Sequence, residues 1–112
     1  MASMRFRLVS AASTNLTKLK NLGADVKGFA IINTNAAARY VKFYDVADPG
    51  PTVGTTAPAL TVLVPATGQV LQSWPDGIYF QYGLWLATTV NAVDSDTTAV
   101  GAGDLIIQAL YE

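Results

Sequence analysis

Three aspartates near the end of the chain have the residue type and spacing of a cation-binding loop. Asp94, Asp96 and Asp104 lie in the stretch NAVDSDTTAVGAGDLII, just before an apolar run. Carboxylate and carbonyl oxygens are the ligands that hard cations such as Ca²⁺ prefer. The helix-loop-helix calcium pattern fails here, because the sixth and twelfth positions counted from Asp94 are alanine and leucine instead of glycine and glutamate.

Two interpretations of this loop stay open. In the first, Asp94, Asp96 and Asp104 form a looser cation site together with carbonyl oxygens. In the second, which we favour, the Asp and Thr side chains hydrogen-bond nearby amides, and Gly101 and Gly103 relieve steric limits where the chain re-enters a sheet. The GAGD segment lacks the further glycine and the helix of a phosphate-binding loop. A glycosidase pair is not expected either, because Asp94 and Asp96 are two residues apart on one loop.

The sequence contains no cysteine and no histidine. Thiol nucleophiles, disulfides, Cys/His zinc sites, imidazole bases and the Ser-His-Asp arrangement are therefore excluded. Carboxylates, Lys, Tyr and hydroxyl groups remain, and they leave few chemistries open. We predict that the protein is not an enzyme and that it has no catalytic, cofactor-binding or metal site.

Charged residues are scarce in this chain. Of 112 residues, 51% are hydrophobic and 13% are charged, against roughly 25% charged in an average soluble domain. A surface rich in Thr, Ser, Asn, Gln, Gly and Ala tolerates close contact with other proteins, and charge depletion is typical of interface cores. The composition thus favours an assembled protein, although a soluble domain rich in Ala and Thr is the alternative.

The charges are divided between two parts of the sequence. All seven basic residues lie within the first 42 positions, and seven of the eight acids follow them. Two interpretations are open. In one, the molecule has a basic and an acidic end and docks head to tail or onto an acidic surface. In the other, which we favour, basic and acidic residues come to alternate in space once the strands pair. The absence of a basic run or a basic-aromatic patch predicts no nucleic-acid partner.

Neither membrane insertion nor secretion is expected. No segment reaches the roughly 18 apolar residues that span a bilayer, and MASMRFRLVS lacks the apolar core of a signal peptide. We expect one domain over residues 1–112, synthesised in the cytoplasm, with residues 1–4 as a flexible N-terminus or an expression remnant.

Short apolar runs separated by turn residues predict an all-β fold. The length and the alternating short and long connections favour a two-sheet β-sandwich of the jelly-roll kind, with a seven-stranded immunoglobulin-like sandwich as the rival. The expected strands cover residues 5–11, 14–23, 26–34, 38–46, 59–65, 69–74, 78–90 and 104–112.

Several local features are predicted with these strands. Segment 14–23 is read as a strand, although its leucines also recur at helical spacing. Segment 26–34 reads as a strand with both faces largely buried. The residues 75–77, Pro-Asp-Gly, predict a turn, and Gly83 predicts a bulge or bend inside the longest strand, 78–90.

Three segments carry a resemblance to a known group of proteins. They are NTNAAARYVKFYDVADPGPTVGTTAPALTVLVPATG, GIYFQYGLWLATT and DSDTTAVGAGDLIIQALY, and the likeness covers most of positions 15–111. The chain resembles small virion proteins of tailed bacteriophages. The resemblance implies a jelly-roll-like fold and a structural role in the virion, in several cases as a decoration or cement protein on the capsid shell, commonly as a trimer. The leucine-rich NLTKLKNL is less like the group.

The resemblance leads to an expected function, which is a capsid decoration protein that stabilises the phage head by protein–protein contacts. Its implied partners are further copies of itself, as a homotrimer, and the major capsid protein or other virion proteins. We expect the contact surfaces at the Arg5/Arg7 edge and at the loop from Pro49 to Pro58. The alternative is a carbohydrate- or receptor-binding module whose exposed aromatic residues stack on sugar rings, with four candidates: Trp74, Tyr79, Tyr82 and Trp85.

Overall fold

The computed structural model describes residues 3–112 and folds them into eight β-strands. The prediction of an all-β fold with eight strands is confirmed. In the described part of the chain, no helix is long and apolar enough to cross a membrane. The strands are β1 (Met4–Val9), β2 (Thr17–Asn21), β3 (Ala24–Asn33), β4 (Arg39–Asp45), β5 (Leu60–Val64), β6 (Gln69–Phe80), β7 (Gly83–Thr89) and β8 (Leu105–Tyr111).

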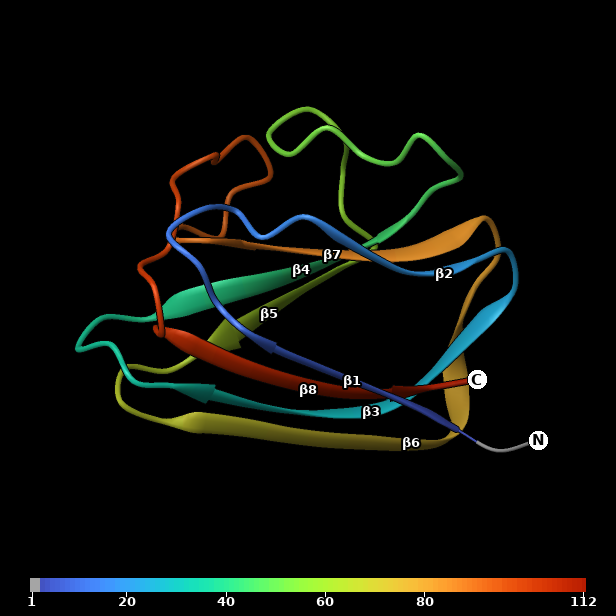
Figure 1. Cartoon of the computed structure of the whole chain (residues 1–112), viewed down its shortest axis with the longest axis horizontal. Coiled ribbons are helices and arrows are strands. Elements are labelled where there is room, and N and C mark those ends of the chain that lie inside the picture. Colours follow the sequence, from blue (N-terminus) through green and yellow to red (C-terminus); the bar gives the residue numbers. More distant parts are fainter. Residues whose placement is uncertain (1–2) are drawn as a thin grey trace.

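The chain pairs with itself as one long hairpin. β1 pairs with β8, β2 with β7, β3 with β6 and β4 with β5, all antiparallel. Rolling this hairpin up places alternate pairs in different sheets, with strand orders β1-β8-β3-β6 and β2-β7-β4-β5. Figure 1 shows the two sheets stacked, with both chain ends at the same end of the sandwich. This is the jelly-roll arrangement, so the predicted two-sheet sandwich is confirmed and the immunoglobulin-like rival is wrong.

The core lies between the inner faces of the two sheets. Alternate residues of each strand point into it, as the period of a strand requires. Phe29 of β3 stacks on Phe43 of β4 with ring centroids 5.7 Å apart, and Phe43 meets the edge of Phe80 at 6.5 Å. Trp74 packs edge-on against Phe29 at 5.4 Å. These rings join one sheet to the other and supply much of the buried apolar area.

The predicted turn at residues 75–77 is wrong, because β6 continues through it. The pairing register between β3 and β6 shifts between Val26 and Gly28, which accommodates the extra residues of β6 as a bulge. β6 is the edge strand of its sheet, so the missing amide proton of Pro75 leaves no ladder bond unmade. Gly77 has a φ of 80°, a conformation that glycine adopts readily.

The predicted single strand over residues 78–90 is also wrong, because the chain changes sheets within it. Residues up to Phe80 belong to β6, and Gly83 opens β7 in the other sheet, so Gly83 is not a bulge in mid-strand. The carboxylate of Asp45 holds the crossing: it accepts hydrogen bonds from the backbone N–H groups of Gln81, Tyr82 and Gly83 at 3.0, 2.8 and 3.4 Å.

Segment 14–23 forms a strand, as predicted, but only over Thr17–Asn21. Asn15 precedes the strand with a φ of 55°, and its side-chain oxygen accepts a hydrogen bond from the Ala11 amide at 2.8 Å. At the N-terminus, Met4 already pairs with Tyr111 in the β1·β8 ladder. The expected flexible segment therefore does not extend to Met4, and residues 1–2 lie outside the described chain.

Two long loops form a third layer over one sheet. The loop between β4 and β5 (46–59) and the loop between β7 and β8 (90–104) both lie above the β2-β7-β4-β5 sheet in Figure 1. A Cβ atom at Gly50 would lie 2.6 Å from the Trp85 ring, and one at Gly54 would lie within 2.4 Å of Thr97. The first loop therefore packs closely on the sheet and on the second loop.

Candidate interaction surface

The outer face of the β1-β8-β3-β6 sheet has no covering layer in the described part of the chain, and we call it the bare face. The strand register sets its residues in three rows, which cross β1, β8, β3 and β6 in that order. Most side chains in these rows are exposed, with Leu71 at 69% and Leu110 at 46%. Two of the rows are Arg5, Leu110, Gly28, Ser73 and Arg7, Gln108, Ala30, Leu71, and the third is Val9, Ile106, Ile32, Gln69.

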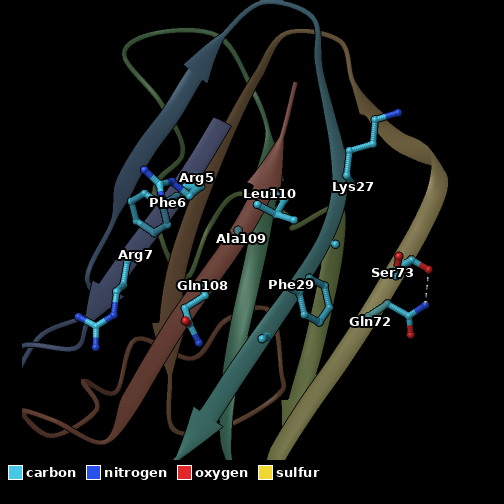
Figure 2. Close-up of a pocket in the computed structure, with 12 residues that line it drawn as sticks. Arg5, Phe6, Arg7, Lys27, Phe29, Gln72, Ser73, Gln108, Ala109 and Leu110 are labelled. Carbon is cyan, nitrogen blue, oxygen red and sulfur yellow. Dashed lines mark hydrogen bonds between the residues drawn. The ribbon is translucent and has the colours of Figure 1, made fainter. Parts of the chain in front are cut away.

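A groove of about 580 Å³ runs along the bare face, and Figure 2 shows the side chains that line it. Its floor lies at Gly28 and Ala30 of β3, which are the small members of the first two rows, between larger residues on β8 and β6. Gly28 is required here, since a Cβ atom would lie 2.6 Å from the carbonyl oxygen of Gln72. The groove therefore follows from the small side chains on β3, next to the register shift between Val26 and Gly28.

The basic residues fall into two groups, according to whether they have a partner. Three cations pair with acids from later in the chain: Lys18 with Asp48 at 3.0 Å, Lys27 with Glu112 at 3.1 Å, and Arg39 with Asp104 at 3.1 Å. The predicted interleaving of charges is thus confirmed for these pairs.

Lys20 and Lys42 instead donate to backbone carbonyl oxygens, those of Gly23 and Val93, at 2.9 and 2.8 Å. Within residues 3–112, Arg5 and Arg7 alone among the cations have neither an ion pair nor a hydrogen-bond partner. Both guanidinium groups are exposed on β1 and line the groove of the bare face.

The outer face of the other sheet is covered over β4 and β7 by its two loops, and we call it the covered face. On the edge strand β5, Leu63 is 52% exposed. Lys42, Tyr44 and Ala87 lie there with 0% exposure. Burial lowers the pKa of Lys42, against the opposite effect of Asp96 and Asp94. Burial, followed by the charge of Asp94, raises the pKa of Tyr44, whose hydroxyl has no hydrogen-bond partner among the described residues. Burying polar groups such as those of Lys42 and Tyr44 is unfavourable, so the two loops must stay fixed over them.

The three aspartates of the predicted cation loop do not come together. Asp96 accepts hydrogen bonds from the Asn91 amide at 3.0 Å and the Thr98 hydroxyl at 2.7 Å, which closes a local turn. Asp104 accepts from Gly101, and also from the side chains of Asn35 and Arg39. Residues 3–112 contain no cluster of three or more His, Cys, Asp or Glu side chains that would suit a metal ion.

Hydrogen bonds also set the pKa values of these two carboxyl groups. Burial would raise both, but the hydrogen bonds to Asp104 and to Asp96 outweigh it and lower each pKa below its ordinary value.

Gly103 has a φ of 76°. Gly101 is needed for its small size and not for its backbone conformation, because a Cβ atom there would lie 3.1 Å from the Asp104 carboxylate oxygens. The loop is the turn that we favoured.

The four aromatic candidates for sugar stacking separate into two pairs. Trp74 packs in the core, and Trp85 lies against the 46–59 loop while its indole N–H donates to the Val46 carbonyl at 3.0 Å. Tyr79 and Tyr82 are exposed, at 61% and 53%. The loop from Pro49 to Pro58, which we expected as a contact surface, packs onto its own sheet with Pro51 buried, and its outer side, including Thr52 and Thr55, is exposed.

Sequence reasoning missed the bare face. We expected residues 26–34 to be buried on both faces, yet Ala30 and Ile32 are only half-buried on the outer side. The signal was present in the apolar run FAII, because an outward apolar residue without a covering segment is typical of an interface. Arg5 and Arg7, which were expected at a contact edge, do lie at the border of this face.

Comparisons with known proteins add little to this geometry. No family model and no curated protein matches the chain. Among solved structures, the crystal structure of PirA is similar to it, with 14% sequence identity, a TM-score of 0.45, and coverage of 100% of this chain and 94% of that chain. A likeness this distant carries no argument about function.

Proposed function

We propose that this protein is a structural virion protein that decorates the capsid of a tailed phage and contacts the shell through its bare face. The observation that supports the proposal is that one sheet has its outer face covered by the chain's own loops while the other does not. Partly apolar surface of this kind is characteristic of protein interaction sites. The proposed partners are the major capsid protein and further copies of the chain, as a homotrimer on the capsid surface.

The size of the bare face suits a protein that is present in many copies. Four strands about 4.8 Å apart and about 20 Å long present roughly 400 Å² in projection. This is less than the roughly 800 Å² that each partner contributes to a standard interface. A single copy then gains little free energy from this contact, whereas a repeated array stabilises a shell through the sum of many contacts.

Sedimentation with isolated shells tests the proposal. Shells that lack this protein are prepared from the phage that encodes it, and wild-type protein is expected to sediment with them. Ala30→Lys places a long cation on the floor of the groove and should reduce retention at least tenfold. Ala57→Lys is the matched control, since Ala57 is exposed on the 46–59 loop above the other sheet, and it should be retained like the wild type. Equal retention of both variants, or none of the wild type, contradicts the proposal.

Light scattering after size exclusion tests the homotrimer. The chain has a mass of 11.8 kDa, so a trimer is distinguished from a monomer by a threefold difference in mass. A monomer at micromolar concentration contradicts the proposed oligomer of the isolated protein.

The exposed Tyr79 and Tyr82 favour a second candidate function, a carbohydrate- or receptor-binding module. Both residues lie near the turn between β6 and β7, and the Leu22 amide of the neighbouring turn donates to the Tyr82 carbonyl at 3.3 Å. Exposed tyrosine rings can stack on sugars. Specific binding on a glycan array that is lost in Tyr82→Ala, with no retention on shells, would favour this module over the decoration protein.

A further inference from the structure

We infer that the free edge of β1 accepts an extended acidic segment of another protein chain as an added β-strand. The inference rests on the proposed function and names the kind of partner segment that binds at the β1 edge, which borders the bare face. It depends on three observations made among residues 3–112: an unpaired strand edge, two guanidinium groups without partners on that strand, and a groove next to them that is lined by three cations and no acid.

Among the strands of the described chain, β1 is an edge strand that pairs with β8 on one side and with no strand on the other. Its outward residues include Arg5 and Arg7, while Phe6 and Leu8 point inward and are only half-buried. An added strand would pair with the free N–H and C=O groups of β1 and cover the open sides of Phe6 and Leu8. The fitting segment therefore alternates apolar residues on the core side with other residues on the outer side.

The two arginines specify what those other residues are. Side chains directly opposite each other on paired strands have Cβ atoms about 5 Å apart, so the outward residues of an added strand would lie beside Arg5 and Arg7. Carboxylates at alternate positions would match both guanidinium groups, which favour bidentate pairing with carboxylates. Lys27 also lines the groove, but its charge is already paired with Glu112.

An edge strand of the other sheet, β2, shows how a basic edge finds partners within this protein. It also carries two cations, Lys18 and Lys20, but Lys18 pairs with Asp48 and lies 5.6 Å from the centre of the Trp85 ring, and Lys20 donates to Gly23. A register shift between the two lysines interrupts this strand. β1 has neither internal partners for its cations nor a register shift against β8, so it is the edge prepared for an acidic partner.

A second copy of the chain fits this edge poorly. Symmetric pairing of β1 with β1 of another copy would bring four guanidinium groups onto one face, and like charges on opposite residues destabilise a sheet. The chain's own alternating acids, Asp94 and Asp96, lie in a closed turn, and Asp96 already accepts hydrogen bonds from Asn91 and Thr98. The acidic strand is therefore expected from a different protein.

A peptide titration tests this inference without shells. The probe is a short synthetic peptide in which aspartate alternates with valine, and its binding to isotope-labelled full-length protein is followed by amide chemical shifts and hydrogen exchange. We expect shift changes along β1 and at least tenfold slower exchange of the β1 amides that do not face β8. Arg5→Glu/Arg7→Glu should weaken binding at least tenfold, whereas the matched variant Lys18→Glu/Lys20→Glu should leave it within about threefold of the wild type.

Three controls give the test its alternatives. A peptide with lysine in place of aspartate, and one with the aspartates gathered at one end, should both bind at least tenfold more weakly than the probe. The inference is overturned if either control peptide binds as tightly as the probe. It is also overturned if Lys18→Glu/Lys20→Glu weakens binding as much as Arg5→Glu/Arg7→Glu, or if the probe slows amide exchange outside β1. A DNA oligonucleotide that competes as well as the acidic peptide overturns it too, because the edge would then be a phosphate site. Self-association through β1 that Arg5→Glu/Arg7→Glu abolishes would assign the edge to a second copy.

The outcomes separate the two proposals. Wild-type protein that sediments with shells but ignores the acidic peptide overturns the strand inference alone. Protein that binds the peptide through β1 but does not sediment with shells overturns the decoration function alone.

Discussion

The two outer faces of this sandwich are built from similar strands but meet different surroundings. On the covered face, Lys42 and Tyr44 are fully buried beneath two loops, and the ammonium group donates to a loop carbonyl. On the bare face, leucines, a glutamine and two arginines lie open. The long loops thus lie over one outer face of the sandwich and leave the other outer face open. The covered face contributes to the stability of the chain, and the bare face is available for contact.

The same substitution at the centre of each face should separate these roles most sharply. Ala87→Lys places a second cation under the loops beside Lys42, its cross-strand neighbour, and should cost about 4 kcal/mol or more of unfolding free energy because a buried charge lacks a partner. Ala30→Lys should cost less than about 1 kcal/mol, because half-buried Ala30 borders an open groove in which the lysine can reach water. Urea denaturation of both variants checks this, and similar costs would show that the two faces do not differ as described.

The ion pair at the end of the 90–104 loop should come next in effect. Asp104 is 9% exposed and holds Arg39, Asn35 and the Gly101 amide. Asp104→Ala should lower the unfolding free energy by about 3 kcal/mol, because it leaves a largely buried guanidinium group unpaired. The same urea experiment measures it, with Asp76→Ala at an exposed site as the control.

Acid should have the same effect on this loop without a substitution. The pKa of Asp104 is lowered in the folded protein, so its carboxylate stabilises the fold above the ordinary pKa of about 3.8, and this contribution is lost as pH falls through the lowered value. Denaturation midpoints from neutral pH down to pH ~3 should fall in the wild type and fall less in Asp104→Asn. Equal pH dependence in both proteins would contradict the role of this carboxylate.

A smaller loss is expected where the other loop meets the covered face. Gly50 has a φ of 100°, and an added Cβ would lie 2.6 Å from the Trp85 ring. Gly50→Ala should therefore cost about 2 kcal/mol, through backbone strain and displacement of the ring. Hydrogen exchange should become faster in residues 46–59 while the bare face keeps its wild-type exchange. Unchanged exchange in the loop would show that its packing on Trp85 is unimportant.

The smallest effect on stability is expected on the bare face itself. Leu71 is 69% exposed, so Leu71→Ser should change the unfolding free energy by less than about 0.5 kcal/mol while weakening retention on shells. A loss of more than about 1 kcal/mol would mean that the leucine already has a partner within the chain.

The fold was largely predictable from the sequence, since hydrophobic alternation and turn residues gave eight strands. The errors occurred where tertiary partners decide. Pro75 and Gly77 are residue types that favour turns, but the same residue types also occur in bulges on edge strands. The crossing after Phe80 depends on the Asp45 carboxylate, which is distant in sequence from the amides it binds.

The candidate surface was predictable only in part. Alternation placed Arg5 and Arg7 on one side of β1, but it does not show which outward faces the loops will cover. For this reason the apolar run in β3 was expected to be buried on both faces, and nothing in RYVKFYD indicated that Lys42 would be buried. Which outer face is covered depends on loop conformation, for example on the close approach of Gly50 to Trp85. Loop conformation produces no periodic pattern in the sequence, so it was not predicted.

The nested pairing of the strands has a consequence for synthesis. Of the strand pairs in the described chain, only β4 with β5 joins consecutive strands, while the outermost pair joins β1 to β8. Long-range pairing of this kind folds slowly and exposes unpaired strands beforehand. β1 cannot pair until β8 has been synthesised, so the sandwich closes late, and any assembly that uses β1 draws on chains in which β8 is already present.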